Sequence, residues 1–212
     1  MTTPSTPPLS LTERRKLATQ LEIARAAAEL FTAHGTDGTT AEAIAGRAGV
    51  ALRTFYRYFR TKQDAVGPLL AVGGDRWRAL LAAAAPGAPL PDALRSAIAA
   101  ALAVPDEAAA DGLRQVRGLL RAAAGDPALR AVWYRVNQES EDKLRPVVAE
   151  LLGAGARPLD VRLAAAAATD AIRLALETWA ETDADVTGPD SPAELAARCL
   201  RGLMGGPTGE TG

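Results

Sequence analysis

The sequence predicts an all-α fold, and three observations support this. Of the 212 residues, 48 are alanine, and leucine and arginine are also abundant, so most positions carry residues of high helix propensity. Only nine residues are aromatic, and β-branched residues are also scarce, which disfavours a sheet-based fold. Segments with apolar residues at helical spacing are separated by proline or glycine breaks. We therefore expect about nine helices.

The first expected helix spans about residues 12–33. Its apolar positions recur at steps of four and three and so lie on one face: Leu17, Leu21, Ala24, Ala28 and Phe31. Gly35 follows and suits the left-handed position after a helix end. Residues 1–10, with three prolines, and the glycine-rich residues 206–212 are expected to be disordered tails.

Two short helices joined by a tight turn are expected next. Thr39 and Glu42 have the spacing of a capping box, so Thr39 is the predicted N-cap of a helix that ends near Ala48. Gly49 breaks this helix, and a second one is expected over residues 51–59. Two short helices joined by a glycine-containing turn form a helix-turn-helix, whose second helix enters the major groove of DNA.

Six longer helices are expected after this motif, each bounded by proline or glycine. Their approximate ranges are 62–85, 91–104, 107–124, 127–153, 159–182 and 191–204. The pair Gly73-Gly74 falls inside the first of them and could bend or interrupt it. The motif and these helices imply two parts of the chain, with a boundary near Lys62.

The charge of the chain is distributed unevenly. The formal net charge is −1, but residues 10–64 hold nine Lys and Arg against six Asp and Glu, whereas residues 65–212 hold fifteen against nineteen. Residues 51–62 carry four bases and no acid, and four of the nine aromatics lie within 55–59. Basic and aromatic side chains thus coincide on the second helix of the motif, which favours nucleic-acid binding.

Other classes of protein are disfavoured. The single Cys199 excludes a disulfide framework within one chain, and no run of about 20 apolar residues predicts a membrane span. The N-terminal segment lacks the features of a secretory signal, so we expect a soluble, cytoplasmic protein. The sole histidine, His34, has no nucleophile or metal-ligand set at a suitable spacing, and no glycine-rich phosphate loop is present. We expect no enzyme activity, no cofactor and no metal.

The segment from Glu13 to Val66 resembles the DNA-binding domain of the TetR family of one-component transcriptional regulators. Eleven positions match the family pattern in register: Thr40, Ile44, Ala45, Ala48, Gly49, Val50, Thr54, Tyr56, Tyr58, Phe59 and Lys62. Ala51 and Ala65 depart from it, where serine and leucine are usual. The substitution at Ala51 predicts that one capping hydrogen bond is missing at the start of the recognition helix.

The residues of this helix suggest separate roles. Arg53 and Arg57 lie four apart on one face, where a guanidinium can reach guanine O6 and N7, so we expect them to read bases. Phe55 and Phe59 can face the core. Phosphate contacts are expected from Thr40, Thr54, Tyr56, Tyr58 and Lys62. Tyr58 could contact either a base or a phosphate, and Tyr56 could instead be a core residue. The role of Lys62 as a phosphate clamp is implied by the resemblance.

The resemblance also implies two domains with different functions. Residues 11–62 would form the DNA-binding domain, and residues 63–205 would form a helical ligand-binding and dimerisation domain. The last two helices of two subunits would pack as a four-helix interface. The small residues of 163–169 are compatible with close helix approach, as is the apolar stripe Leu195, Cys199, Leu200 and Leu203. The alternative is that these residues serve only the core of one chain.

Candidates for an effector pocket are few because aromatic residues are rare in this half. They are Trp77, Trp133, Asn137, Asp170 and Trp179. A tryptophan in an Ala/Leu core either fills space or lines a cavity, and its N–H then needs a partner. Trp133 and Asn137 lie four apart and could face one cavity. Asp170 could instead pair locally with Arg173 and Glu177.

The sequence therefore predicts a homodimeric regulator that binds double-stranded DNA. The expected mechanism is a repressor that a small, apolar or amphipathic effector releases from a palindromic operator. An activator of the same fold is an alternative. A second alternative is a helical small-molecule binding protein without specific DNA binding.

Overall fold

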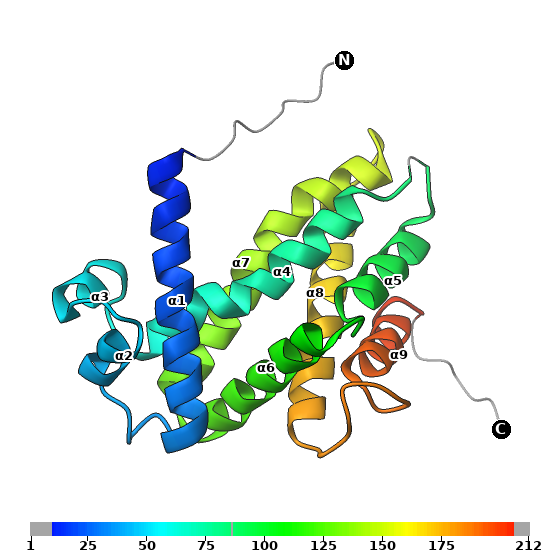
Figure 1. The fold of residues 1–212 in the computed structure, drawn as a ribbon. Coiled ribbons are helices and arrows are strands. Elements are labelled where there is room, and N and C mark those ends of the chain that lie inside the picture. Colours follow the sequence, from blue (N-terminus) through cyan, green and yellow to red (C-terminus); the bar gives the residue numbers. More distant parts are fainter. Residues whose placement is uncertain (1–9, 86, 206–212) are drawn as a thin grey trace. The chain divides into compact units, whose positions relative to one another are not determined.

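The computed structural model describes residues 10–85 and 87–205, and all regular secondary structure in this part of the chain is helical (Figure 1). It contains nine α-helices, one 3-10 helix (η1) and no strand, which confirms the predicted all-α class. The helices are α1 Leu11–His34, α2 Ala41–Arg47, α3 Leu52–Tyr58, η1 Gln63–Val66, α4 Gly67–Ala82, α5 Leu90–Ala101, α6 Glu107–Gly125, α7 Pro127–Leu152, α8 Pro158–Ala180 and α9 Pro192–Gly205.

The chain divides into two compact units, and the boundary between them in the sequence falls within α4. The first unit ends at Leu69 and the second begins at Leu70, whereas the sequence placed the boundary after Lys62. The expected tails, except Ser10, lie outside the described residues. Among the helices of the described part, none is both long enough and apolar enough to cross a membrane.

Helix α1 begins with a capping box that the sequence analysis missed. Ser10 Oγ accepts a hydrogen bond from the Glu13 N–H at 3.2 Å, and Glu13 Oε2 accepts one from the Ser10 N–H at 2.9 Å. The hydrogen bond from the Ser10 hydroxyl to the same carboxylate holds the pKa of Glu13 below its ordinary value. Ser10, assigned to the tail, is therefore the N-cap of α1.

The predicted cap of α2 is wrong by one residue. Thr40 is the N-cap, and its side-chain oxygen accepts a hydrogen bond from the Ala43 N–H at 3.1 Å. Thr39 is 1% exposed, and its hydroxyl donates toward the carbonyls of Leu30 and Gly35 at the end of α1. The Thr39 hydroxyl is bound to the end of the preceding helix, and Thr40 caps α2 instead.

The first unit has a small aromatic and aliphatic core drawn from three helices. Phe31 of α1, Ile44 of α2 and Phe55 of α3 are each at most 1% exposed. Ala65 and Val66 of η1 are fully buried, and η1 packs against α1. Helix α2 packs on α1, and α3 packs on α2. This packing fixes the short helices, because helices of this length are marginal in isolation.

The turn between α2 and α3 depends on a glycine. Gly49 has φ +66°, a conformation that favours glycine, and the next residue, Val50, donates its N–H to the Ala45 carbonyl at 2.9 Å. Ala51 is the N-cap of α3 and makes no side-chain capping hydrogen bond, as predicted.

The second unit begins within an α4 that continues through Gly73-Gly74. The expected helix over 62–85 is instead divided earlier, into η1 and α4. A Cβ atom at Gly74 would lie 2.9 Å from Ser140 Oγ of α7. The glycine therefore permits close approach of α4 and α7 and does not interrupt the helix.

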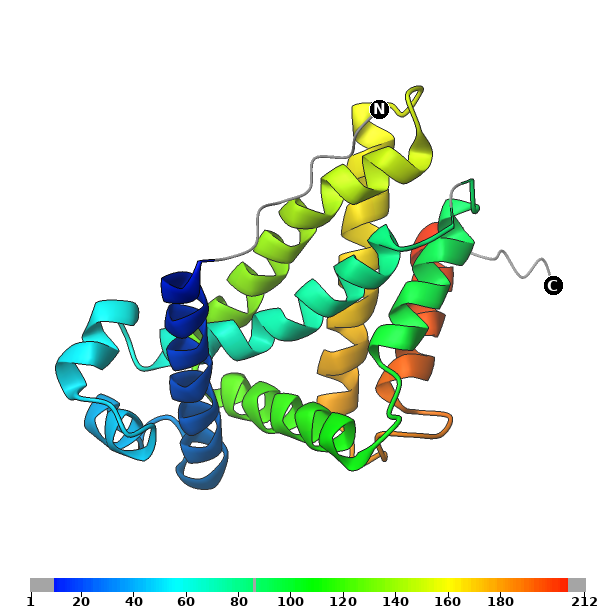
Figure 2. The same ribbon diagram turned by 45° about the horizontal axis from the view of Figure 1, so that its top comes forward.

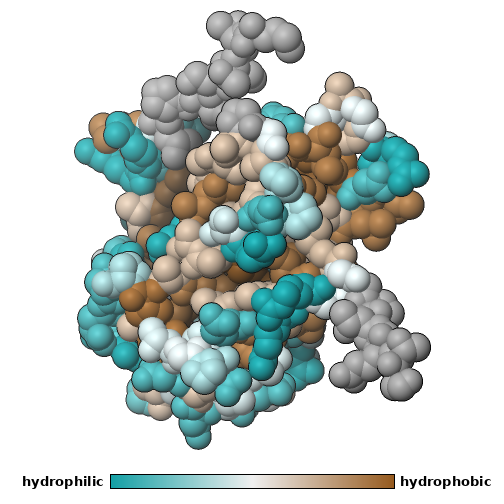
Figure 3. Space-filling model, turned by 90° about the vertical axis from the view of Figure 1, so that its right-hand side faces the viewer, coloured by the Kyte–Doolittle hydropathy of each residue, from teal (hydrophilic) through white to brown (hydrophobic). Residues whose placement is uncertain are grey.

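Helices α8 and α9 form the most extensive helix pair, with α9 running back along α8 after a loop (Figure 2). Ala164, Ala165 and Ala168 are buried on α8, so the predicted small residues do allow close helix packing. Helix α7 packs on α8, and α5 packs on α9. The face that carries α5 and α9 shows patches of hydrophobic surface interrupted by polar side chains (Figure 3).

Candidate DNA-binding surface and effector cleft

Helix α3 presents its basic face to solvent and its phenylalanines to the core. Phe55 is fully buried and Phe59 is 6% exposed, as predicted, whereas Arg53 and Arg57 are exposed. Tyr56 is 54% exposed and meets the edge of Phe55 with ring centroids 5.4 Å apart. The structure thus places Tyr56 on the surface and not in the core, with its hydroxyl available to a partner.

Arg57 and Tyr58 support each other at the end of α3. The Arg57 guanidinium carbon lies 4.9 Å from the centroid of the Tyr58 ring, and Arg57 Nη2 donates to the Tyr58 hydroxyl at 3.2 Å. This contact restricts the guanidinium while leaving further donors free. A restrained guanidinium loses less conformational entropy when it binds a phosphate or a base.

A surface groove of about 460 Å³ lies between α1 and α3. We call it the basic groove; it is lined by Thr12, Arg15, Lys16, Thr19, Arg57 and Tyr58. Three of the six are bases and none is an acid, so the groove suits a phosphate. Sequence reasoning missed the α1 side of this site, although the run Arg14-Arg15-Lys16 was a visible signal.

Two threonines predicted to contact phosphate have different settings. Thr40 is exposed at the N-terminus of α2, and its hydroxyl proton is available because the oxygen serves as the cap acceptor. Thr54 is half-buried on α3, and its backbone N–H donates to the Ala51 carbonyl at 2.7 Å.

Lys62 has a structural role that the sequence did not indicate. Its ammonium donates hydrogen bonds to the Thr36 carbonyl at 2.7 Å and to the Thr39 carbonyl at 2.9 Å. Both threonines are buried, at 8% and 1% exposed. The lysine therefore satisfies two carbonyls of the turn between α1 and α2 and ties that turn to the start of η1.

The second unit has a cleft where the ends of α6 and α8 meet the start of α7. We call it the α6–α8 cleft; its volume is about 610 Å³, and it is lined by Leu120, Arg121, Ala123, Ala124, Arg130, Trp133, Tyr134, Glu177, Ala180, Glu181 and Asp183. Trp133 Nε1 donates to Glu177 Oε1 at 2.7 Å, and Arg173 Nη1 lies 2.9 Å from the other carboxylate oxygen.

Of the five predicted effector residues, Trp133 lines this cleft. Trp77 is 3% exposed and Trp179 is fully buried, so the structure places both in the core and outside the lining of this cleft. Asn137 donates its side-chain amide to the Trp133 carbonyl at 2.9 Å. Asp170 accepts from Arg173 at 2.9 Å, the local pairing that the sequence favoured.

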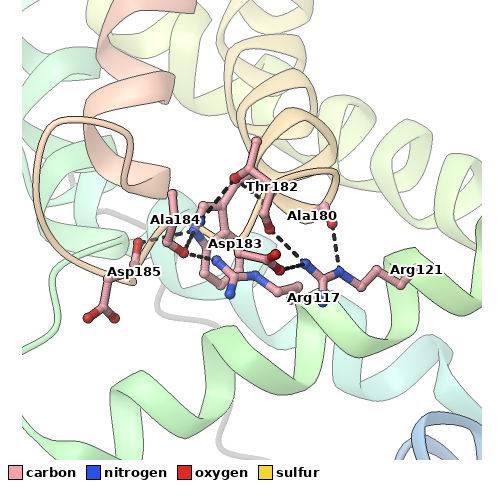
Figure 4. A network of polar contacts seen from close by, with 8 residues as sticks. Arg117, Arg121, Ala180, Thr182, Asp183, Ala184 and Asp185 are labelled. Atoms are coloured by element: carbon pink, nitrogen blue, oxygen red, sulfur yellow. Dashed lines mark hydrogen bonds and ion pairs between the residues drawn. The ribbon is translucent and has the colours of Figure 1, made fainter.

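A network of polar contacts links α6 to the end of α8 (Figure 4). Arg121 donates to the carbonyls of Ala180, at 2.8 Å, and Thr182, at 2.7 Å, and to the Asp183 carboxylate at 2.8 Å. Arg117 donates to the Ala184 carbonyl. Two arginines of α6 thus hold the end of α8 and the loop that follows it.

Two comparisons of the sequence agree on a family. The sequence model of the bacterial regulatory proteins of the tetR family matches residues 23–66, which run from the middle of α1 to the end of η1. The HTH-type transcriptional regulator TcmR of Streptomyces glaucescens is 31% identical over 150 residues, which cover 69% of this chain. The chain belongs to the TetR family. The match spans 65% of the length of TcmR.

Solved structures of TetR-family proteins share the fold. A transcriptional regulator from Mesorhizobium loti aligns over 93% of this chain and 98% of its own, with a TM-score of 0.57 and 21% identity. The repressor FadR of Thermus thermophilus, in complex with lauroyl-CoA, aligns over 87% of this chain and 92% of its own, with a TM-score of 0.51 and 25% identity.

The TetR-family match falls on the unit that carries the basic surface. It includes α2, α3 and the exposed Arg53 and Arg57, but it begins after Lys16. The α1 side of the basic groove is therefore a feature of this chain that the geometry reveals outside the matched segment.

Proposed function

We propose that this TetR-family protein is a homodimeric transcriptional repressor that binds a palindromic DNA site and leaves it when an effector binds the second unit. The observation that carries this proposal is the exposed basic face of α3. Arg53 and Arg57 stand one turn apart, and no acid lies among the residues of the adjoining basic groove. A short helix held on a buried Phe55 is a rigid support for such contacts.

The two parts of the basic surface have different roles. Arg53 and Arg57 read base edges in the major groove, where a guanidinium can bind guanine through two hydrogen bonds. Arg15, Lys16 and the hydroxyl of Thr40 bind phosphates and set the position of α3. Tyr56 and Tyr58 add hydroxyl donors beside the arginines, and Thr54 adds another.

Dimerisation supplies the specificity that one short helix lacks. Leu159 and Leu163 lie four apart on α8 and are 65% and 59% exposed. On α9, Leu195 and Leu200 are buried within the chain, whereas Leu203 is 46% exposed. The predicted stripe therefore serves the core in part and leaves apolar residues for a second copy. A two-fold dimer reads two half-sites about 34 Å apart, or a multiple of this.

Effector response follows from linkage. A ligand that binds more tightly to the conformation with the wrong spacing of the two α3 helices lowers the affinity of the protein for DNA. Bound DNA lowers the affinity for the ligand by the same factor. The α6–α8 cleft supplies a site of suitable size for a small molecule, because ligand sites commonly measure about 300–1,000 Å³.

The experiment that tests this function begins with the purified full chain and fragmented genomic DNA. We expect a small set of fragments to be retained, and a mobility shift with one of them to weaken steeply as salt rises. Arg53→Ala should relax the base preference within one half-site by about 1–3 kcal/mol. Arg95→Ala, a surface arginine of α5 paired with Asp92, is the charge-matched control and should change nothing.

Two outcomes would favour the alternatives. Binding that is no tighter for any fragment than the non-specific level of about 10⁻⁴ to 10⁻⁶ M would indicate a small-molecule binding protein without specific DNA recognition. A reporter gene placed behind the retained site separates a repressor from an activator. In cells that lack this protein, expression of the reporter gene should rise. A fall in reporter expression would identify an activator.

A further inference from the structure

The α6–α8 cleft has an aromatic wall on one side. Trp133 and Tyr134 are neighbours on α7, and both line the cleft. Trp133 is 6% exposed and is fixed by its hydrogen bond to Glu177, whereas Tyr134 is 49% exposed. The ring of Tyr134 is therefore the larger accessible aromatic surface, and exposed aromatic surface beside a cleft is suited to contact with a ligand.

The two arginines of the lining are already engaged. Arg121 binds the carbonyls of Ala180 and Thr182, and Arg130 donates to the carbonyls of Ala123 and Ala124 at 3.2 and 2.6 Å. These carbonyls lie at or just beyond the C-terminal ends of α8 and α6, where partial negative charge accumulates. A ligand that drew either arginine away would leave these carbonyls without their donors.

One carboxylate of the lining remains available. Glu177 has both oxygens occupied, by Trp133 and Arg173, and Asp183 pairs with Arg121. The side chain of Glu181 makes no hydrogen bond or ion pair with any residue in the described ranges 10–85 and 87–205. The cleft thus combines an unpaired carboxylate, an accessible aromatic ring and two helix C-termini.

The nearby N-terminus of α7 does not provide free N–H donors for an anion. Asp126 caps it, and its Oδ1 accepts from the Ala128 and Leu129 N–H groups at 2.8 and 3.0 Å. Its carboxylate thus occupies the donors that an anionic ligand would need. The lining holds three carboxylates against two guanidiniums that are already bound to carbonyls, and this balance favours a cation over an anion.

We propose that the α6–α8 cleft binds an organic cation with an aromatic body. The cationic centre lies near the Glu181 carboxylate, and the aromatic body packs against Tyr134 and the edge of Trp133. The Arg173 guanidinium carbon lies 5.8 Å from the centroid of the Tyr134 ring, which is 49% exposed. Cation–π attraction to the remaining exposed surface of this ring and apolar contact add to the charge pairing. This proposal rests on the proposed function only in identifying the ligand as the effector, because binding itself is measured without DNA.

Two probes of the same shape and opposite charge test the proposal. Tetraphenylphosphonium is an aromatic cation, and tetraphenylborate is its anionic counterpart. Isothermal titration calorimetry with the full chain should show that the phosphonium binds at least about tenfold more tightly, which corresponds to roughly 1.4 kcal/mol. Equal or tighter binding of the borate would overturn the proposal.

Matched variants locate the site. Glu181→Gln should weaken phosphonium binding by up to about fivefold, as for one partly solvated charge pair. Tyr134→Ala should weaken it by roughly tenfold, and Tyr134→Phe should retain most of the affinity. Glu139→Gln removes an exposed carboxylate of α7 outside the lining and serves as the control. If Glu181→Gln and Tyr134→Ala bind as the unaltered chain does, the cleft is not the site.

A separate measurement links the ligand to regulation. The phosphonium is added to the complex of the full chain with its retained DNA fragment. Release of DNA by the unaltered chain, reduced in Glu181→Gln, supports an effector role. Binding in the calorimeter without release of DNA leaves the ligand class standing and contradicts the effector response of the proposed function.

Discussion

The guanidinium of Arg117 stacks on the indole of Trp179, with its central carbon 3.5 Å from the ring centroid. Trp179 is fully buried, and its Nε1 donates to the carbonyls of Ala184 and Asp185 at 3.0 and 3.1 Å. Arg117 donates to the Ala184 carbonyl as well. Burial lowers the pKa of the Arg117 guanidinium from its ordinary value, and the nearby charge of Arg121 acts in the same direction.

Removal of the Arg117 cation should destabilise the second unit. Arg117→Met keeps the apolar stem over Trp179 but removes the cation–π contact and one donor to Ala184. We expect a loss of about 1–3 kcal/mol in the free energy of unfolding, measured by urea denaturation. Arg114→Met, an exposed arginine of the same helix paired with Glu107 and Asp111, should leave the midpoint nearly unchanged. Equal effects of the two variants would contradict a specific role for the stacked pair.

The position of Trp179 illustrates what the sequence could not decide. The helices were predicted because their signals are local, such as the break at Gly49 or the proline that begins α7 and α8. Whether Trp179 lines a pocket depends on Arg117, which reaches it from another helix. Lys62 likewise meets Thr36 across 26 positions of sequence. Such pairings arise from tertiary packing, so the spacing of apolar residues along the sequence does not predict them.

The contact of Lys62 with the turn predicts a folding defect that mimics loss of DNA binding. Lys62→Met removes the donors to the Thr36 and Thr39 carbonyls, and we expect a cost of about 2–3 kcal/mol to the first unit. At temperatures where this unit stays folded, the affinity for the retained DNA fragment should fall by less than about threefold. A larger fall with an unchanged unfolding curve would instead assign Lys62 to a direct phosphate contact.

The capping box at the start of α1 predicts a pH dependence. The pKa of Glu13 is lowered in the folded chain, so its contribution to stability is complete above the unfolded pKa and is lost as pH falls through the folded value. Ser10→Ala removes the hydroxyl partner, so it should lower the free energy of unfolding most near neutral pH, and its difference from the unaltered chain should shrink as pH falls through the folded pKa. Equilibrium unfolding between pH 3 and pH 7, roughly the span of a carboxyl titration, checks this. Glu22→Gln, on an exposed carboxylate of α1 without a role in the cap, is the control.

The basic groove predicts a phosphate role for a residue outside the segment that matches the family. Lys16→Ala should weaken binding to all DNA sequences alike and lower the slope of log affinity against log salt by about 0.9. The helix should fold as before, because Lys16 is exposed. Arg25→Ala removes a base of the same helix that pairs with Glu22 and does not line the groove, so its slope should be unchanged. A change in base preference with Lys16→Ala would assign this residue to readout instead.

The exposed leucines of α8 predict an assembly defect that also abolishes DNA binding. Leu159→Glu with Leu163→Glu places charges on two side chains that are 65% and 59% exposed in the single chain, so the fold should persist. In a dimer the same charges would be buried without partners, and sedimentation should show a monomer at concentrations where the unaltered chain is a dimer. Affinity for a two-half-site fragment should fall more than about tenfold, because each monomer then binds one half-site alone.

Val72→Glu, at a 49% exposed position of α4, is the matched control. A dimer that survives the double substitution would place the interface elsewhere.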